Sequence, residues 1–254
     1  MKKMYLGAQL YTVREYMKNE ADFKETVKKI ADIGYKYVQV SGIGDVSPDA
    51  IKEATEANGI KVILTHTDSK RIRDNTEAVI ADHNIFSCDA LGIGGMPYSH
   101  DEKGYFDFCK DFAPAIEKLK ATGKVLLYHN HRFEFEKYNG KYGIEIILEN
   151  SDPDGLKLTF DTYWAVAAGI DVPAFMAKYA DRIYATHLKD MAVKNDKQIM
   201  TEMLTGNINF DAILDVCGEN DILWHFVEQD EVYMNAFDSM KISHDNLKAR
   251  FNLD

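Results

Sequence analysis

The chain has 254 residues, of which 46% are hydrophobic and 11% aromatic, and this composition is typical of a folded globular protein and excludes a disordered one. Its 41 acidic residues outnumber the 30 lysines and arginines, so the formal net charge is −11. This acidic balance argues against a nucleic-acid partner, because binding to a phosphate backbone rests on a basic surface.

Short apolar runs rich in β-branched residues alternate with amphipathic stretches along the chain. Eight runs are predicted to be strands, and they occupy residues 6–10, 37–42, 60–66, 90–96, 124–130, 156–161, 183–190 and 222–229. A helical stretch follows each run. In the first of these stretches Asp22 is the predicted cap and Gly34 ends the helix. The others are expected at 48–58, weakly through 72–80, at 105–122, 144–150 and 172–179, from 210 onward, and up to 251.

Nearly continuous apolar strands, each followed by a helix, predict a parallel sheet covered by helices. Eight such units in roughly 250 residues match a single closed (β/α)₈ TIM barrel. The competing doubly wound sheet places a glycine-rich GxGxxG loop after its first strand, where this chain has LGAQLYTVRE. No linker or change of composition divides the chain, so we expect one domain over residues 1–254.

The three cysteines and the N-terminal segment bear on the compartment. Cys88, Cys109 and Cys217 lie far apart and form no CxxC pair, which favours a reducing compartment over a disulfide framework. The N-terminal segment turns polar after only a few apolar residues, and no run approaches the length of a membrane span. We therefore expect a cytoplasmic protein with no membrane partner.

Polar residues collect at the carboxyl ends of five expected strands, where a barrel of this kind places its reactive groups. They are Thr65-His66-Thr67-Asp68, His129-Asn130-His131, Asp161, His187-Leu188-Lys189-Asp190 and Glu228-Gln229-Asp230. Each group follows an apolar run that would otherwise continue into the core, which is an unfavourable place for an unpaired charge. A divalent cation at their centre would reconcile these converging carboxylates and imidazoles.

Simpler interpretations exist for each residue taken alone. A lone histidine at a strand end is usually solvated or locally bonded. Asp161 can cap the helix that follows it, and Glu228 can pair with Lys189. The recurrence of the pattern at five strand ends favours a shared site over five unrelated contacts.

Four runs, LYHNHRFEFE, TFDTYWAVAAG, HLKD and FVEQD, resemble in order and spacing the sugar phosphate isomerase/epimerase group of the xylose-isomerase-like TIM barrels. That group includes inosose dehydratases, hydroxypyruvate isomerases and ketose 3-epimerases, and the resemblance covers the whole chain. It implies a divalent ion (manganese, cobalt, magnesium or zinc) held by residues from the fifth to the eighth strand. The positions that match the family's aspartate, histidine and glutamate are Asp161, His187 and Glu228.

The fifth strand departs from the family pattern. A gap-free match places His129 where the family has a glutamate, and Glu134 and Glu136 come several residues later. Epimerases of the group use two glutamates as bases on opposite faces of the substrate. We therefore expect one strong base here, Glu228, with a pKa raised by its closed pocket. His129 is then the fourth metal ligand or its near neighbour, and Glu134 is the reserve candidate.

These residues and the resemblance predict a metal-dependent sugar, or sugar phosphate, isomerase/epimerase that removes a proton next to a carbonyl. Glu228 is the expected base, and His131 and Lys189 are expected to hold or protonate substrate oxygens. The expected substrate-binding residues are Tyr11, placed on the first strand, His66, Trp164 and Glu134. The expected partner is a small carbohydrate.

Three alternatives remain. A metal-dependent lyase or dehydratase of a keto-sugar or cyclitol would use the same ion and the same proton abstraction. A metal-assisted phosphodiesterase would need more ligands for several ions and a basic surface. A barrel that only binds sugars would need no metal at these positions. The sequence also leaves open the metal, the phosphorylation of the substrate and a homo-oligomer.

Overall fold

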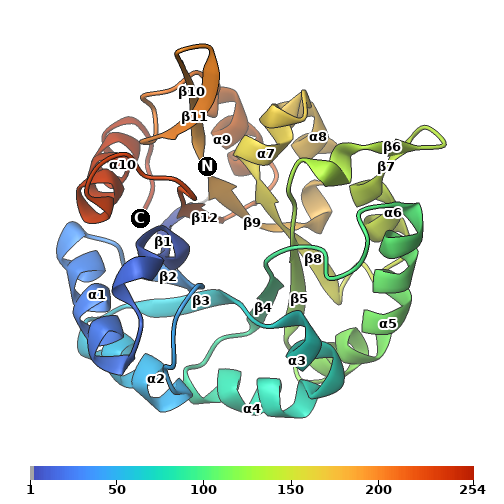
Figure 1. Cartoon of the computed structure of the whole chain (residues 1–254), viewed down its shortest axis with the longest axis horizontal. Coiled ribbons are helices and arrows are strands. Elements are labelled where there is room, and N and C mark those ends of the chain that lie inside the picture. Colours follow the sequence, from blue (N-terminus) through green and yellow to red (C-terminus); the bar gives the residue numbers. More distant parts are fainter. Residues whose placement is uncertain (1–2) are drawn as a thin grey trace.

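The computed structural model describes residues 3–254, and its central feature is a closed barrel of eight parallel strands. Going round the barrel, the strands follow the order β1, β12, β9, β8, β5, β4, β3 and β2. The helices form a ring outside the strands (Figure 1). The predicted (β/α)₈ barrel is confirmed. Within residues 3–254, no helix is both long and apolar enough to cross a membrane.

The elements have the following bounds. The barrel strands are β1 (Tyr5–Gln9), β2 (Tyr37–Val40), β3 (Lys61–His66), β4 (Ala90–Ile93), β5 (Val125–His129), β8 (Leu156–Asp161), β9 (Ile183–Leu188) and β12 (Trp224–Val227). The helices are α1 (Glu20–Ile33), α2 (Pro48–Ala57), α3 (Ser69–Asp74), α4 (Thr76–Ile85), α5 (Glu102–Ala121), α6 (Gly143–Glu149), α7 (Thr162–Ala167), α8 (Val172–Lys178), α9 (Phe210–Glu219) and α10 (Ala236–Arg250). Three 3-10 helices are η1 (Leu10–Tyr16), η2 (Phe133–Phe135) and η3 (Ala180–Arg182).

Several of these elements differ from the sequence prediction. The weak helical stretch after β3 is two helices, α3 and α4, and the short helix α7 follows β8 directly. Two hairpins lie outside the barrel, one of β6 (Lys137–Tyr138) with β7 (Lys141–Tyr142) and one of β10 (Asp190–Lys194) with β11 (Lys197–Thr201). The second hairpin projects beyond the ring of helices (Figure 1).

Capping determines where α1 begins. Asn19, and not Asp22, is the cap: its side-chain oxygen accepts hydrogen bonds from the backbone nitrogens of Ala21 and Asp22, at 3.0 and 3.1 Å. Asp22 lies in the first turn, where a carboxylate favours the positive end of the helix dipole. Gly34 ends the helix as predicted, with a φ of 122° that glycine adopts without steric cost.

The inner layer of the barrel explains why polar side chains gather at one end. Leu64, Leu127, Ala185 and Phe226, on four different strands, share one buried cluster with Ala90. Side chains alternate along a strand, so the residue two positions later faces the same interior. In these four strands the later residues are His66, His129, His187 and Glu228. The apolar packing of the barrel therefore directs the polar residues above it toward one axis.

Candidate metal centre and cavity

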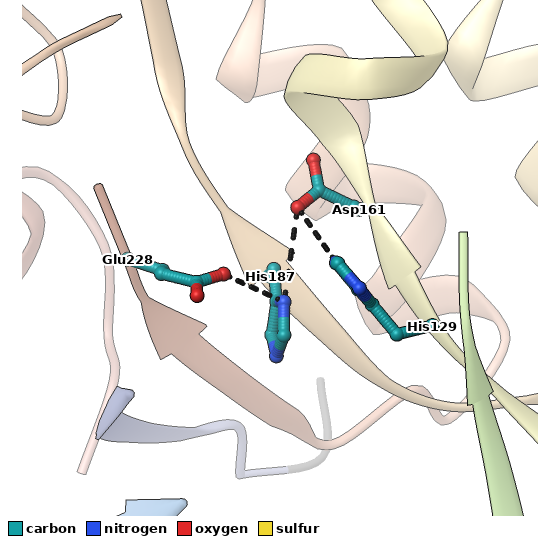
Figure 2. Close-up of side chains that lie close together, drawn as sticks. All are labelled: His129, Asp161, His187 and Glu228. Carbon is teal, nitrogen blue, oxygen red and sulfur yellow. Dashed lines mark hydrogen bonds and ion pairs between the residues drawn. The ribbon is translucent and has the colours of Figure 1, made fainter. Parts of the chain in front are cut away.

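Four buried side chains at the carboxyl ends of neighbouring strands converge on one point. His129 ends β5, Asp161 ends β8, His187 lies in β9, and Glu228 follows β12. One ligand atom of each lies within 4.8 Å of the others. The four side chains point toward one another (Figure 2). The structure thus brings together the four residues that the sequence predicted as metal ligands, and we call them the four-residue group.

Gln39, on β2, orients the ring of His187. His187 Nε2 lies 2.6 Å from Gln39 Oε1, and because an amide oxygen can only accept, Nε2 carries the proton. His187 Nδ1 then faces Glu228 Oε2 at 2.9 Å and Asp161 Oδ2 at 3.7 Å. Burial disfavours a charge on this ring, but Glu228 and Asp161 raise the pKa of His187, so their negative charges favour a positive charge at this nitrogen. A cation between these atoms would supply that charge.

The donor atoms of the four-residue group fit a divalent cation. His187 Nδ1 is buried without a hydrogen-bond partner, although buried polar atoms are normally paired. Glu228 Oε2 is buried close to it, and within residues 3–254 the only positive charge in contact with this oxygen besides the histidine ring is the ammonium of Lys189, at 2.8 Å. Two imidazole nitrogens and two carboxylate oxygens form a donor set that suits zinc, manganese or cobalt. An ion held by His129, Asp161, His187 and Glu228 would give the unpaired nitrogen of His187 a partner.

Lys189 brings a positive charge into the same group. Its Nζ lies 2.9 Å from Asp161 Oδ2 and 2.8 Å from Glu228 Oε2. The two oxygens of Asp230 are 3.1 and 3.0 Å from the same nitrogen. The ammonium therefore lies in ion-pair contact with three carboxylates. Lys189 is not among the residues that line the neighbouring cavity, and its role at a substrate oxygen stays a prediction.

These contacts determine the pKa values of the buried acids. Burial disfavours the charged forms of Asp161 and Glu228, but Lys189 together with the nearby histidines outweighs it and holds both pKa values well below their ordinary range. The raised pKa that we expected for Glu228 is therefore wrong, because the expectation left out an ammonium in direct contact. Burial also opposes the charge of Lys189, but the carboxylates around it raise its pKa.

A cavity of about 430 Å³ opens beside the four-residue group. Of that group, His129 and Glu228 line the cavity; of the other predicted site residues, Tyr11, His66, His131 and Trp164 do so. A hollow of about 490 Å³ lies at the opposite ends of the strands, near Gly59 and Ser87, away from the group. The chemistry of the side chains, and not the volume, therefore distinguishes the first cavity.

Two histidines on the cavity wall, His66 and His131, are neutral at physiological pH. Burial and the neighbouring His129 lower the pKa of His131 to about 3, and the same causes hold the pKa of His66 well below its ordinary value. His66 Nε2, His131 Nδ1 and Trp164 Nε1 are buried without a hydrogen-bond partner. Unpaired polar atoms on a cavity wall favour a ligand that carries several hydrogen-bonding groups.

Two predicted substrate-binding residues lie elsewhere than expected. Tyr11 belongs to η1 and not to the first strand, although its side chain does line the cavity. Glu134 has no exposed surface and is not part of the cavity wall. Its carboxylate accepts hydrogen bonds from Tyr128 Oη and from the backbone nitrogen of His131, both at 2.7 Å. Glu134 therefore holds the segment that carries His131.

The simpler interpretations of Asp161 and Glu228 are also observed. Asp161 caps α7, since its Oδ1 accepts a hydrogen bond from the backbone nitrogen of Trp164 at 3.0 Å. Glu228 forms an ion pair with Lys189. Neither contact excludes a shared site, because Asp161 caps the helix with one oxygen and faces the four-residue group with the other.

Sequence reasoning missed several supporting residues. Gln9 donates from Nε2 to Glu228 Oε1 at 3.0 Å, and Gln39 accepts from His187. Asn130 accepts from the backbone nitrogen of Asp161 at 2.8 Å. A signal was available for the glutamines, because each interrupts an apolar strand run, where a buried amide needs a partner. Asn130 and Asp230 were noted at their strand ends but were given no role. Asp230 holds Lys189 and lines the cavity.

Comparison with known proteins finds relatives that share the fold and sequence features of this chain. The family described as xylose isomerase-like TIM barrel matches residues 27–227. A crystal structure of a sugar phosphate isomerase/epimerase from Parabacteroides distasonis ATCC 8503 is 25% identical with a TM-score of 0.83, covering 99% of this chain and 100% of that one. An inosose dehydratase from Clostridium perfringens is 21% identical over 275 residues, covering 92% of each chain. A D-psicose 3-epimerase from Ruminiclostridium cellulolyticum is 24% identical over 172 residues, covering 57% of this chain and 58% of that one.

Proposed function

The chain belongs to the xylose isomerase-like TIM barrel family, and from this premise we propose that it is a metal-dependent enzyme that removes a proton next to the carbonyl of a small polyhydroxylated substrate. The observation that carries the proposal is the position of the four-residue group at the wall of a cavity with unpaired polar atoms. A sugar, keto-sugar or cyclitol has the hydroxyl groups to pair with these atoms.

The four-residue group would hold the ion. A divalent cation supplies Lewis acidity, which polarises a carbonyl oxygen and makes the neighbouring C–H more acidic. Glu228 is the proposed base, because it is the carboxylate of the group that also lines the cavity. Gln9 holds Glu228 Oε1 and so limits rotation of the carboxylate. Lys189 keeps this carboxylate ionised, so it can accept a proton, but the lowered pKa also makes it a weaker base.

The cavity wall would position the substrate. His131 is neutral, so its unpaired ring nitrogen can exchange a hydrogen bond with a substrate hydroxyl. Trp164 offers both a flat indole face and an unpaired N–H. His66 lies on the β3 side of the cavity, where Ser41 Oγ lies 3.3 Å from its Nδ1. These contacts would fix which carbon faces Glu228.

The carboxylates of the cavity favour chemistry on one face of the substrate. Asp161 has no exposed surface, and an imidazole, His129, ends the fifth barrel strand. Asp230, which also lines the cavity, follows the same strand as Glu228 and shares Lys189 with it. Inversion at one carbon requires a second base on the opposite face of the substrate. The carboxylates among the described residues that line the cavity are Glu228 and Asp230, and neither is a candidate for that base. We therefore propose an isomerisation in which one group moves the proton.

A dehydratase is the second candidate. The same proton abstraction, followed by loss of a hydroxyl from the next carbon, gives elimination and also needs one base on one face. One observation favours a dehydratase. The four-residue group has an imidazole, His129, in addition to His187, so only two of its members, Asp161 and Glu228, are carboxylates. The similarity to an inosose dehydratase over 92% of both chains supports this candidate as well.

Hydrogen exchange in D₂O tests the proposal. The protein, supplied with Mn²⁺, is incubated with ketoses, keto-sugars and inososes, and NMR follows deuterium incorporation next to the carbonyl. An isomerase exchanges this hydrogen and interconverts the sugars, whereas a dehydratase releases water and forms an unsaturated product. Glu228→Gln should abolish the exchange, because it keeps the shape of the side chain but removes the base and one proposed ligand of the ion. Metal binding with no exchange on any of these compounds would contradict the proposal and favour a barrel that only binds sugars.

A further inference from the structure

The ammonium of Lys189 contacts the two carboxylate oxygens that face the proposed ion. Asp161 Oδ2 lies 2.9 Å from Lys189 Nζ and 3.1 Å from His129 Nε2. Glu228 Oε2 lies 2.8 Å from the same Nζ and 2.9 Å from His187 Nδ1. The lysine side chain is 1% exposed, so water does not screen these contacts. Lys189 and an ion held by the four-residue group would therefore depend on the same oxygens.

The charges around Lys189 leave room for a second cation. Asp161, Glu228 and Asp230 all contact its ammonium, so three carboxylates surround one positive charge. These three carboxylates and the ammonium sum to two negative charges, which is the charge that one divalent ion neutralises. The charges of the site therefore favour binding of the ion together with the charged lysine. The ammonium then needs a carboxylate partner outside the four-residue group.

Asp230 provides that partner. Both of its oxygens lie within 3.1 Å of Lys189 Nζ. Asp230 is outside the four-residue group, its side chain is 27% exposed, and it lines the cavity. If the ammonium leaves Asp161 and Glu228, it keeps its contact with Asp230 and moves toward the cavity.

We propose that Lys189 and the divalent ion compete for Asp161 and Glu228, and that binding of the ion transfers the ammonium to Asp230. This inference rests on the proposed metal dependence. It has two consequences. The ion binds less tightly than it would to the same four ligands without Lys189. When the ion is present, N–H groups of Lys189 become free at the cavity wall. A cationic donor would then face the substrate only in the metal-loaded protein.

Mn²⁺ titration calorimetry on metal-stripped protein tests the competition. Lys189→Met removes the competing charge but keeps much of the side-chain volume, and we expect Mn²⁺ to bind roughly tenfold or more tightly. Lys124→Met is the matched control, because Lys124 is also buried but contacts Cys88 and Asp89 instead. It should leave the Mn²⁺ affinity unchanged. Equal or weaker Mn²⁺ binding by folded Lys189→Met would overturn the competition.

Asp230→Asn tests the transfer without changing Lys189. The variant should bind Mn²⁺ more weakly, because the displaced ammonium loses its carboxylate. In the Lys189→Met background the same substitution should have a much smaller effect, since no ammonium needs a new partner. An unchanged affinity of Asp230→Asn, or an equal loss in both backgrounds, would overturn the transfer.

The outcomes separate this inference from the proposed function. If wild-type protein binds Mn²⁺ and Lys189→Met binds it with the same affinity, only the competition fails. If neither protein binds Mn²⁺, the metal dependence fails and the competition fails with it. Thermal unfolding gives a second readout: without Mn²⁺, Lys189→Met should melt at a lower temperature than wild type, because two buried carboxylates lose their counter-charge. Mn²⁺ should raise its melting temperature more than that of wild type.

Discussion

Gln39 holds the ring of His187 from a strand that is not next to it in the barrel. Gln39 Oε1 accepts the hydrogen bond from His187 Nε2 at 2.6 Å, and both side chains are fully buried. This bond fixes the tautomer and directs His187 Nδ1 at the carboxylates of Asp161 and Glu228. Gln39 is therefore part of the candidate metal centre without being one of its ligands.

The first prediction concerns this hydrogen bond. Gln39→Leu removes the acceptor and frees the ring, and we expect the Mn²⁺ affinity to fall roughly 10- to 100-fold. Gln39→Glu keeps an acceptor oxygen and should retain more of the affinity. Calorimetric titration measures both. Gln198→Leu, at an exposed position on β11, is the control and should bind Mn²⁺ like wild type. Wild-type affinity in Gln39→Leu would show that the ring is held by other contacts.

The second prediction separates the two roles of Asp161. Asp161→Asn retains an oxygen for the cap of α7 but removes the charge, so we expect lost Mn²⁺ binding and some loss of stability from the broken ion pair with Lys189. Asp161→Ala removes both, and loss of the cap should cost about 1 kcal/mol more in unfolding free energy. Urea unfolding and calorimetry together test this. Mn²⁺ binding that survives in Asp161→Asn would leave the helix cap as the main role of this residue.

The third prediction uses the alternation of side chains along β5. His129 faces the barrel axis with Leu127, whereas Tyr128 packs in the outer core and donates to Glu134 at 2.7 Å. His129→Gln should therefore weaken Mn²⁺ binding or turnover. Tyr128→Phe should lower stability by about 1 to 3 kcal/mol, because it removes a buried donor, and should leave Mn²⁺ affinity near wild type. The opposite order of effects would contradict the assignment of His129.

The fold and the approximate place of the site could be predicted because both depend on repetition. Eight apolar runs fix the barrel, and the same alternation that puts Leu127 inside puts His129 above it. The helix α7 could not be predicted, since its six residues are too few to show a period. The hairpin β10–β11 could not be predicted as a separate element, because β10 begins almost directly after the apolar run of β9.

The contacts that set charge and orientation could not be predicted in the same way. Gln39 and His187 are 148 residues apart in sequence, and periodicity says which face a residue takes but not which atom it meets. Sequence reasoning paired Glu228 with Lys189 as an alternative to a metal site, but it could not show that Asp161 and Asp230 share the same ammonium. The lowered pKa of Glu228 follows from that contact.

The last prediction concerns stability and pH at Glu134. Burial raises the pKa of this carboxyl from 4.5 to about 7, although Tyr128 and the backbone of His131 donate to it. The folded protein thus retains this proton more firmly than the unfolded chain. The resulting stability is fully present below about pH 4.5 and is lost as the pH rises to about 7, a change of about 3 kcal/mol.

Glu134→Gln cannot ionise, so this pH dependence should disappear in the variant. Relative to wild type, the variant should gain about 3 kcal/mol in unfolding free energy between pH 4.5 and pH 8, measured by urea unfolding at both values. A stability difference that does not change with pH would contradict the buried, protonated carboxyl.

The same variant tests the role of Glu134 as a reserve metal ligand, which the sequence suggested. Its carboxylate lies behind β5 and holds Tyr128, away from the four-residue group. Mn²⁺ affinity should therefore equal that of wild type, and a clear loss would return Glu134 to the set of candidate ligands.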